Sequence, residues 1–237
     1  LNTIDRRFYP SETGLFRHLV DTREEHRLWR DGAAASLVCL DEMNLSQVEH
    51  YFSDFMMILE RTDDARMLHC FDEHAVGDGC PYRRWSKVRI SPAVSFVGTV
   101  NFDESTRLLS DRLLDRINLI QLQPDGLAVT SASAAFPAAT GRPICLADVV
   151  SWRHDHSVPQ DVAALMDALR PVLSRLGSAL SPRVQRAILG YVRSATGFFK
   201  PEVAFDLQLA QRVLPKIRGV LTRRRLDALD ELDKLLE

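Results

Sequence analysis

The sequence predicts an α/β protein in which a core with a parallel sheet is followed by an all-helical domain. Two apolar runs, residues 33–40 (AAASLVCL) and 94–100 (VSFVGTV), have the continuous hydrophobic character of strands that are covered on both faces. From about residue 151 onward, the spacing of apolar residues is wholly helical. We therefore expect the core in residues 1–126, a linker in residues 127–150 and the helical domain in residues 151–237.

The first strand is expected to lead into an amphipathic helix. Ser46 and Glu49 fit a capping box at the start of that helix. Apolar residues then repeat at helical spacing along one face, namely Val48, Tyr51, Phe52, Phe55, Met56 and Leu59. The polar stretch that follows, residues 61–92, is expected to form a surface hairpin with extended pieces at residues 67–71 and 87–90.

Beyond the second strand, the pattern predicts a helix over residues 104–116 and a short third strand over residues 117–122. The helix would bury three leucines, Leu108, Leu109 and Leu113. Residues 127–143 are rich in Ala, Ser, Thr and Pro without clear periodicity, which is typical of a boundary between domains. Four helices are then expected near residues 162–176, 182–195, 201–214 and 221–236. Pro171 is expected to break or kink the first of these helices.

The composition is that of an ordinary globular protein, with 46% hydrophobic residues and a formal net charge of −2. A contact with DNA would therefore have to come from a local basic patch. The candidates are Arg83–Trp85 and residues 223–225, although basic runs of this kind are more often simply solvated. The four cysteines form no CxxC pair, which fits free thiols in a cytoplasmic protein. No apolar run approaches the ~20 residues of a membrane span.

Polar side chains follow both apolar runs at the point where each run ends. Asp41 and Glu42 close the first run, and Asn101 closes the second. Ligands of open α/β sheets bind outside the carboxyl ends of the strands, so these side chains are expected to share one site if the strands are parallel neighbours. Adjacent carboxylates suit a division of labour in which one supports Mg²⁺ and the other polarises a water molecule. The alternatives are a solvated turn for the acids and a helix N-cap for Asn101.

Two arginines, Arg112 and Arg116, lie four residues apart on one face of the expected helix over residues 104–116. Such arginines are ordinarily solvated surface charges. Next to a nucleotide site they are also candidates for an arginine finger, because a guanidinium stabilises the charge on a phosphoryl group during transfer.

The segment LVCLDEMNLSQVEHYFSDFMMILE (residues 37–60) resembles the Walker B strand and following helix of McrB-like AAA+ NTPases. The segment VSFVGTVNFDESTRLLSDRLLDRINLI (residues 94–120) is similar to the sensor 1 strand and arginine-finger helix of that family, in the same order. Three weaker similarities accompany these two: residues 8–21 resemble the stretch before Walker B, and LSPRVQRAILGYV and FDLQLAQRVLPKIRG resemble parts of the helical lid.

The resemblance implies a partial AAA+ core followed by a lid domain, and it assigns a role to each candidate residue. Asp41 would hold Mg²⁺ and Glu42 would be the catalytic base, with Asn101 as sensor 1. Arg116 would be the arginine finger, with Arg112 as the second choice. Two further positions match the family pattern and would contact the nucleotide site. Asn44 could orient the catalytic acid or the water. Arg183 would be sensor 2, or it could simply face solvent.

The sequence departs from the family in one respect, because G-x-x-x-x-G-K-[ST] does not occur in the 237 residues. That loop supplies the backbone amides and the lysine that hold the β and γ phosphates. The matching region begins downstream of the family's phosphate-binding loop, so we expect the loop to precede Leu1 in a longer chain. These residues alone are then expected to bind nucleotide weakly and to be inactive.

The resemblance implies an oligomeric, cytoplasmic motor, expected to be a hexameric ring that hydrolyses ATP, or GTP, with Mg²⁺. By family analogy it would act in modification-dependent restriction or phage defence with a McrC-like nuclease. Two alternatives remain open from the sequence: a MoxR-like chaperone that remodels proteins, and an interaction module that does not hydrolyse nucleotide.

Overall fold

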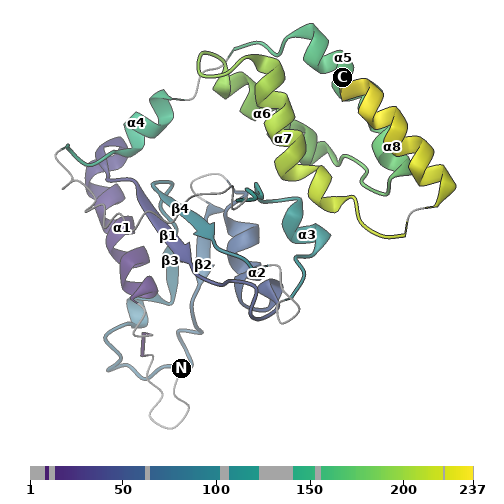
Figure 1. The fold of residues 1–237 in the computed structure, drawn as a ribbon. Helices are drawn as coiled ribbons and strands as arrows, with labels where there is room; N and C mark the ends of the chain where they lie inside the picture. Colours follow the sequence, from purple (N-terminus) through teal and green to yellow (C-terminus); the bar gives the residue numbers. More distant parts are fainter. Residues whose placement is uncertain are drawn as a thin grey trace, which may run out of the picture. The chain divides into compact units, whose positions relative to one another are not determined.

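The computed structural model describes residues 9–10, 14–61, 65–101, 107–122, 141–152, 156–220 and 222–236. Within these ranges the chain is a mixed α/β protein that divides into two compact units (Figure 1). The first unit comprises the described residues up to Leu109 together with Gly141–Ser151. The second comprises the described residues from Ser110 to Leu122 and from Trp152 onward.

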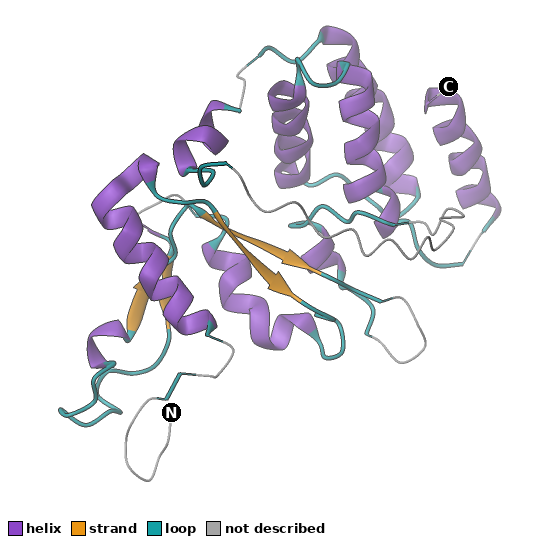
Figure 2. Ribbon diagram, turned by 60° about the vertical axis from the view of Figure 1, so that its left-hand side comes forward, coloured by secondary structure: helices purple, strands orange, loops and turns teal. Residues whose placement is uncertain are grey.

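Two strands, β1 (Ser36–Leu40) and β4 (Val94–Gly98), form the parallel sheet of the first unit, with Leu40 opposite Gly98 (Figure 2). The expectation that both faces of these strands are covered is wrong within the described residues. Val38 and Phe96 pack into the core on one face, whereas Leu37 is 66% exposed and Val97 is 43% exposed on the other. Alternate residues of a strand point to opposite faces, so covering one face leaves every second side chain open.

The helix α2 (Val48–Ile58) covers the buried face of β4. Phe96 contacts two of its aromatic rings, with centroid distances of 5.6 Å to Phe52 and 5.2 Å to Phe55. The predicted capping box is absent, because Gln47 is the N-cap and no side chain caps the helix. The helix is stabilised by burial of its apolar face rather than by its first turn.

A 15-residue helix, α1 (Leu15–Trp29), packs against the hairpin formed by β2 (Met67–His69) and β3 (Lys87–Arg89). The two strands are antiparallel, as expected for the polar stretch between the parallel strands. Leu19 of α1, Val88 of β3 and Ile58 of α2 are buried in one cluster, which joins the hairpin to the helices. A 3₁₀ turn, Arg30–Gly32, ends α1.

Residues 141–151 belong to the first unit and not to a separate linker. The helix α4 (Leu146–Ser151) follows an antiparallel bridge between Cys145 and Ala34, just before β1. Asp148 fixes the start of α4, because its carboxylate accepts hydrogen bonds from the Cys145 backbone N–H at 2.8 Å and from Arg142 at 2.6 Å. These contacts lower the pKa of Asp148 well below its usual range, the Arg142 hydrogen bond contributing most.

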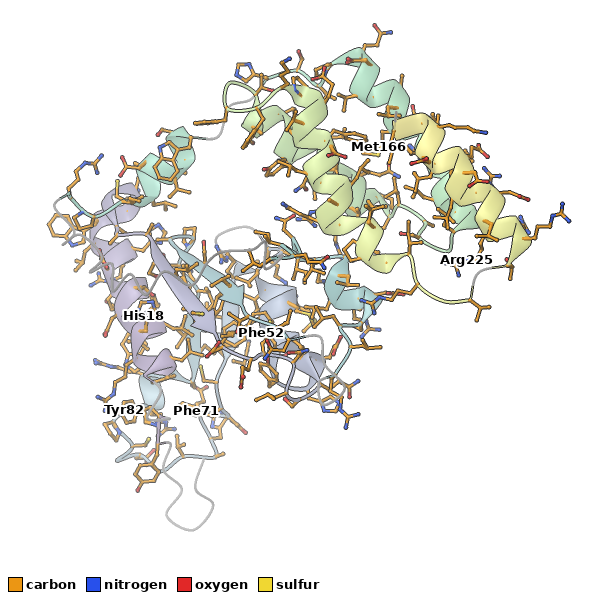
Figure 3. The ribbon with its side chains drawn as sticks, viewed as in Figure 1. His18, Phe52, Phe71, Tyr82, Met166 and Arg225 are labelled. Atoms are coloured by element: carbon orange, nitrogen blue, oxygen red, sulfur yellow. The ribbon has the colours of Figure 1, made fainter. Side chains whose placement is uncertain are left out.

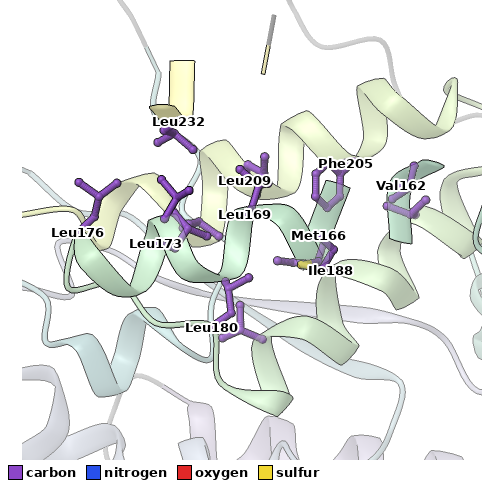
Figure 4. Close-up of a cluster of buried hydrophobic side chains, with 14 of the residues drawn as sticks. Val162, Met166, Leu169, Leu173, Leu176, Leu180, Ile188, Phe205, Leu209 and Leu232 are labelled. Carbon is purple, nitrogen blue, oxygen red and sulfur yellow. The ribbon is translucent and has the colours of Figure 1, made fainter. Parts of the chain in front are cut away.

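The second unit is helical and consists of α3 (Asp111–Leu114), α5 (Gln160–Arg175), α6 (Pro182–Ala195), α7 (Pro201–Arg212), a 3₁₀ turn (Leu214–Lys216) and α8 (Arg223–Leu236). The last four helices agree closely with the predicted ranges. Leucines of α5, including Leu169 and Leu173, meet Leu209 of α7 in a continuous buried cluster (Figure 4). Burying each such side chain contributes about 1.5–3 kcal/mol, so this cluster provides the main stabilisation of the unit.

The expected break at Pro171 does not occur, and α5 continues through it. Pro171 is exposed, while Leu169 and Val172 beside it are fully buried. The buried side chains on the core face therefore offset the ~3 kcal/mol cost of an internal proline. The helix ends at Arg175. Gly177 follows with a φ of 80°, which suits glycine, and Ser178 N–H donates to Leu173 O at 2.9 Å.

The structure corrects the predicted elements between residues 104 and 122. Helix α3 covers only Asp111–Leu114, and the part of the predicted helix at 104–106 lies outside the described residues. Leu109 and Leu113 are buried as expected, but Leu108 is 76% exposed. Residues 117–122 form no strand and contact α7 instead: Leu119 N–H donates to Gln211 O at 3.1 Å, and Gln208 Nε2 donates to Asn118 Oδ1 at 3.3 Å.

None of the helices in the described ranges combines the length and the hydrophobicity that crossing a bilayer requires.

Candidate functional site

The carboxyl ends of β1 and β4 meet through Thr99. Its hydroxyl donates a hydrogen bond to Asp41 Oδ1 at 2.5 Å and accepts one from the Glu42 backbone N–H at 2.8 Å. The Met43 N–H donates to Thr99 O at 2.9 Å, so the backbone pairing continues past the last residues of the two strands. The parallel register therefore holds both acids of the first strand against the end of the second.

Thr99 was not among the residues that we singled out from the sequence. No signal in the sequence identifies it, because its position follows from the register of the paired strands: Leu40 lies opposite Gly98, and Asp41 and Thr99 are the residues that follow. Gly98 itself allows a close contact, because a Cβ at this position would lie 2.1 Å from the Met43 sulfur. Met43 thus crosses over the end of β4 where only glycine leaves room.

Glu42 has a backbone φ of 49°, in the left-handed region that side-chain-bearing residues rarely adopt. This conformation costs about 1–2 kcal/mol for a residue other than glycine. It persists here because the Glu42 N–H is held by Thr99 and its carbonyl accepts a hydrogen bond from Leu45 N–H at 3.1 Å. Backbone strain of this kind is concentrated at functional sites, where the position of a side chain matters more than local stability.

Asn44 is buried, with 1% of its surface exposed, and its side chain ties the two strand ends together. Its Nδ2 donates to Asn101 O at 2.7 Å and to Arg107 O at 3.2 Å, and its Oδ1 accepts from Asn101 N–H at 3.2 Å. The amide of Asn44 is therefore engaged with backbone groups. Its geometry is that of a positioning residue for the end of β4, rather than of a group that contacts nucleotide.

Asn101 lies at the same end of the sheet as Asp41 and Glu42, and its side chain is exposed. Its backbone is held on both sides by the Asn44 amide, which fixes the direction of the chain after β4. The alternative role of Asn101, capping a helix that starts at Asp103, falls on residues outside the described ranges. The structure thus brings four of the predicted site residues together: Asp41, Glu42, Asn44 and Asn101.

A pocket of about 720 Å³ opens beside the two acids. Asp41 and Glu42 line it together with β1, His18 of α1 and Tyr51 of α2, whereas Thr99 and Asn101 do not. His18, labelled in Figure 3, contacts the Ser36 hydroxyl at 3.1 Å, and the Tyr51 hydroxyl donates to Met43 O at 2.6 Å. The volume lies in the range of small-molecule sites, so a ligand of nucleotide size would fit next to the carboxylates.

Arg112, Arg116 and Arg183 belong to the second unit and are described within it. Arg112 is exposed on α3, and Arg116 follows that helix, half-buried, with its N–H bonded to Leu113 O at 2.9 Å. Arg183 is exposed in the first turn of α6, directly after the Ser181 N-cap. Their predicted roles depend on the placement of this unit, and on a neighbouring subunit in the case of the finger.

Among the described residues, no group of three or more His, Cys, Asp or Glu side chains is arranged to hold a metal ion. The predicted Mg²⁺ site would have fewer than three protein ligands, because it would consist of Asp41 and one neighbouring oxygen atom. Mg²⁺ is commonly bound in this way, by one or two carboxylates with the remaining ligands supplied by phosphate oxygens and water.

Residues 144–237 match the model of a family described as "Domain of unknown function (DUF8727)". The match covers the helices from α4 to α8 and leaves out Asp41, Glu42 and Asn101. No curated protein and no solved structure matches the chain.

Proposed function

We propose that these residues are part of an AAA+ nucleoside-triphosphate hydrolase that resembles McrB. The observation that carries the proposal is the parallel pairing of β1 with β4, which places Asp41, Glu42 and Asn101 at one end of one sheet. Phosphate-binding α/β proteins use this edge for their ligands.

The three side chains have separate roles in the proposed reaction. Asp41 would hold Mg²⁺, and the ion would supply positive charge that neutralises the phosphates of ATP or GTP. Glu42 accepts a proton from the attacking water as that water reaches the γ-phosphorus. Asn101 orients the water or a γ-phosphate oxygen. The Thr99 hydroxyl holds the Asp41 carboxylate and the Glu42 backbone N–H in place.

In the proposed ring, arginines complete the site at subunit interfaces. Arg116 of one subunit would reach the nucleotide of the next, with Arg112 as the second candidate, and Arg183 would sense the nucleotide from the helical unit. Hydrolysis would be coupled to movement between the two units. By analogy with the family, such a ring would assemble as a hexamer and work with a McrC-like nuclease in restriction or phage defence.

The proposal requires a phosphate-binding loop, which the 237 residues do not contain. The test therefore uses a chain in which these residues are joined to such a loop. Glu42→Gln should retain MgATP affinity within about threefold and lower kcat by at least about 100-fold, because only the proton acceptor is lost. Glu73→Gln, an exposed glutamate on the hairpin, is the matched control and should leave both quantities unchanged. Turnover that survives Glu42→Gln would reject the role of Glu42.

The arginine finger has its own test in the same chain. Arg116→Ala should leave nucleotide binding intact and remove the part of the hydrolysis rate that rises with protein concentration. Mixing Arg116→Ala with Glu42→Gln subunits should restore part of the activity. Where an Arg116→Ala subunit binds the nucleotide, its own Glu42 is intact and the neighbouring Glu42→Gln subunit supplies an intact Arg116. Failure of the mixture to regain activity would argue against a finger supplied in trans.

A further inference from the structure

A second concave site in the first unit is strongly basic. It has a volume of about 690 Å³ and lies between the C-terminal half of α1 and the hairpin. The lining holds five cationic side chains, namely Arg23, Arg27, Arg30, Lys87 and Arg89. It holds one carboxylate, that of Asp31, and a second carboxylate, that of Glu24, pairs with two of the cations. The chain as a whole has a net charge of −2, so the positive charge of this site is local and does not reflect the overall composition.

The basic lining follows from two regular spacings. Arg23 and Arg27 are four residues apart on α1, which puts them on one helical face about 6 Å apart along the axis. Lys87 and Arg89 are two residues apart on β3, which puts them on one face of the strand at a similar spacing. Val88 between them is fully buried and packs in the cluster with Leu19 of α1. The contact that joins the helix to the strand therefore also brings the two rows of cations together.

The guanidinium groups on the helix side are held in position. Glu24 accepts a hydrogen bond from Arg23 at 2.6 Å and another from Arg27 at 2.9 Å, so one carboxylate orients two arginines. The Arg23 guanidinium also lies over the Trp85 ring at 5.0 Å, and Arg84 approaches the same ring at 5.0 Å. Packing against an aromatic ring lowers the freedom that each arginine would lose when it binds an anion.

We infer that this basic groove binds the phosphodiester backbone of a nucleic acid strand. Arginine supplies four of the five cations, and its planar fork is suited to phosphate oxygens. The groove is concave and lined from two sides, which suits a strand better than a flat bilayer surface. The base edges are not read in this mode, so binding is independent of sequence and strongly dependent on salt. This inference concerns a different part of the first unit and does not depend on the proposed hydrolysis.

The test measures fluorescence anisotropy of a labelled 20-nucleotide DNA strand, and of its duplex, with the 237-residue chain over a range of salt concentrations. The variant Arg27→Gln/Arg30→Gln removes two exposed cations of the groove. Its affinity for the single strand should fall at least about tenfold near 0.1 M salt, and the slope of log K against log[salt] should fall by about 0.7 per cation removed. The control Arg17→Gln removes an exposed arginine of the same helix outside the groove and should leave affinity and slope unchanged.

Lys87→Gln tests the groove from the strand side and should show a smaller loss in the same direction. Binding of either DNA form that is weakened by the groove variants and not by Arg17→Gln supports the inference and identifies the preferred form. Three results would overturn it: no DNA binding at low salt, equal losses in the groove variants and in Arg17→Gln, or binding to phosphatidylserine vesicles without binding to DNA. Far-ultraviolet circular dichroism of each variant separates these results from misfolding.

Discussion

The Thr99 hydroxyl donates to the Asp41 carboxylate at 2.5 Å while it accepts from the Glu42 N–H at 2.8 Å. The side chain that directly follows β4 therefore holds the Asp41 carboxylate and the Glu42 backbone, both of which follow β1. The contact is possible only because the two strands run in the same direction, with their carboxyl ends side by side. An antiparallel pair would have placed Thr99 at the opposite end of the sheet from the acids.

Removing the Thr99 hydroxyl should loosen the turn after β1. Thr99→Val keeps the shape of the side chain and loses both hydrogen bonds, and we expect it to lower the free energy of unfolding by about 1 kcal/mol, because the site is solvent-exposed. Urea titration followed by circular dichroism measures this difference. Thr99→Ser retains the hydroxyl and should behave like the original chain. Equal losses in the two variants would show that the methyl group, and not the hydroxyl, stabilises the turn.

Asn44 should matter more for stability than any other polar residue of the site. Asn44→Ala removes a buried side chain and its three hydrogen bonds to the backbone of Asn101 and Arg107, and it should cost about 2–3 kcal/mol in the same urea titration. Gln47→Ala, three residues away at an exposed position without a capping bond, is the control and should cost no more than about 0.5 kcal/mol. If Asn44→Ala lowers the free energy of unfolding as little as Gln47→Ala does, the Asn44 hydrogen bonds do not stabilise the ends of the two strands.

The contact between Gly98 and Met43 predicts a coupled pair. Gly98→Ala introduces a Cβ 2.1 Å from the Met43 sulfur and should destabilise the unit by about 1–2 kcal/mol, because Met43 must leave its position. In Met43→Ala the obstacle is gone, so adding Gly98→Ala should then cost clearly less. A double-mutant cycle of unfolding free energies gives the coupling. Additive losses would mean that the two residues do not share this space.

The four cysteines should differ in their reactivity with a maleimide. All four are free thiols, with Cys39 exposed on β1 and Cys80 buried. Burial raises the pKa of the Cys70 thiol to about 11, so at pH 8 its reactive thiolate is rare and its labelling rate should increase steadily as the pH approaches 11. In chains with one cysteine each, Cys39 should label well before Cys70. Slow labelling of Cys39 would show that the outer face of β1 is covered in solution.

Asp148 should make the attachment of α4 sensitive to acid. Its pKa is lowered in the folded protein by Arg142 and by the Cys145 N–H. A carboxylate of this kind adds stability above its unfolded-state pKa of about 3.9, and that stability is lost as the pH falls through the lowered folded value. The melting temperature of Asp148→Asn should therefore be lower than that of the original chain at pH 7, and the gap should narrow toward pH 2. A gap that does not change with pH would contradict the account; Asp54→Asn, exposed on α2, is the control.

Regular spacing made much of the fold predictable. The apolar repeats of the four long helices gave ranges within about two residues of α5, α6, α7 and α8, because each buries one continuous face. The parallel pairing of the two apolar runs was also anticipated. The sequence predicted residues 107–122 only in part: Leu109 and Leu113 are buried as expected, whereas Leu108 is exposed. No strand forms at 117–122, where Leu119 is held by Gln211, a residue far away in the chain.

The site was predictable in part for the same reason. Acids and an amide at the ends of two strands can be recognised from the sequence, whereas the partner of Asp41 depends on the register, which only the paired strands define. The basic groove was not predicted from the sequence, because Arg23 and Arg27 lie some 60 residues before Lys87 and Arg89 and no local pattern links the two pairs.

The most direct test of the proposed function asks whether Glu42 and Asn101 act on the same nucleotide. It measures single-turnover ATP hydrolysis by Glu42→Gln, Asn101→Ala and the double variant, in a chain that includes a phosphate-binding loop. Groups that act on one water and one γ-phosphate are strongly non-additive, so the double variant should be about as slow as the slower single variant. Rate losses that multiply in the double variant would show that the two strand ends do not serve a shared catalytic site.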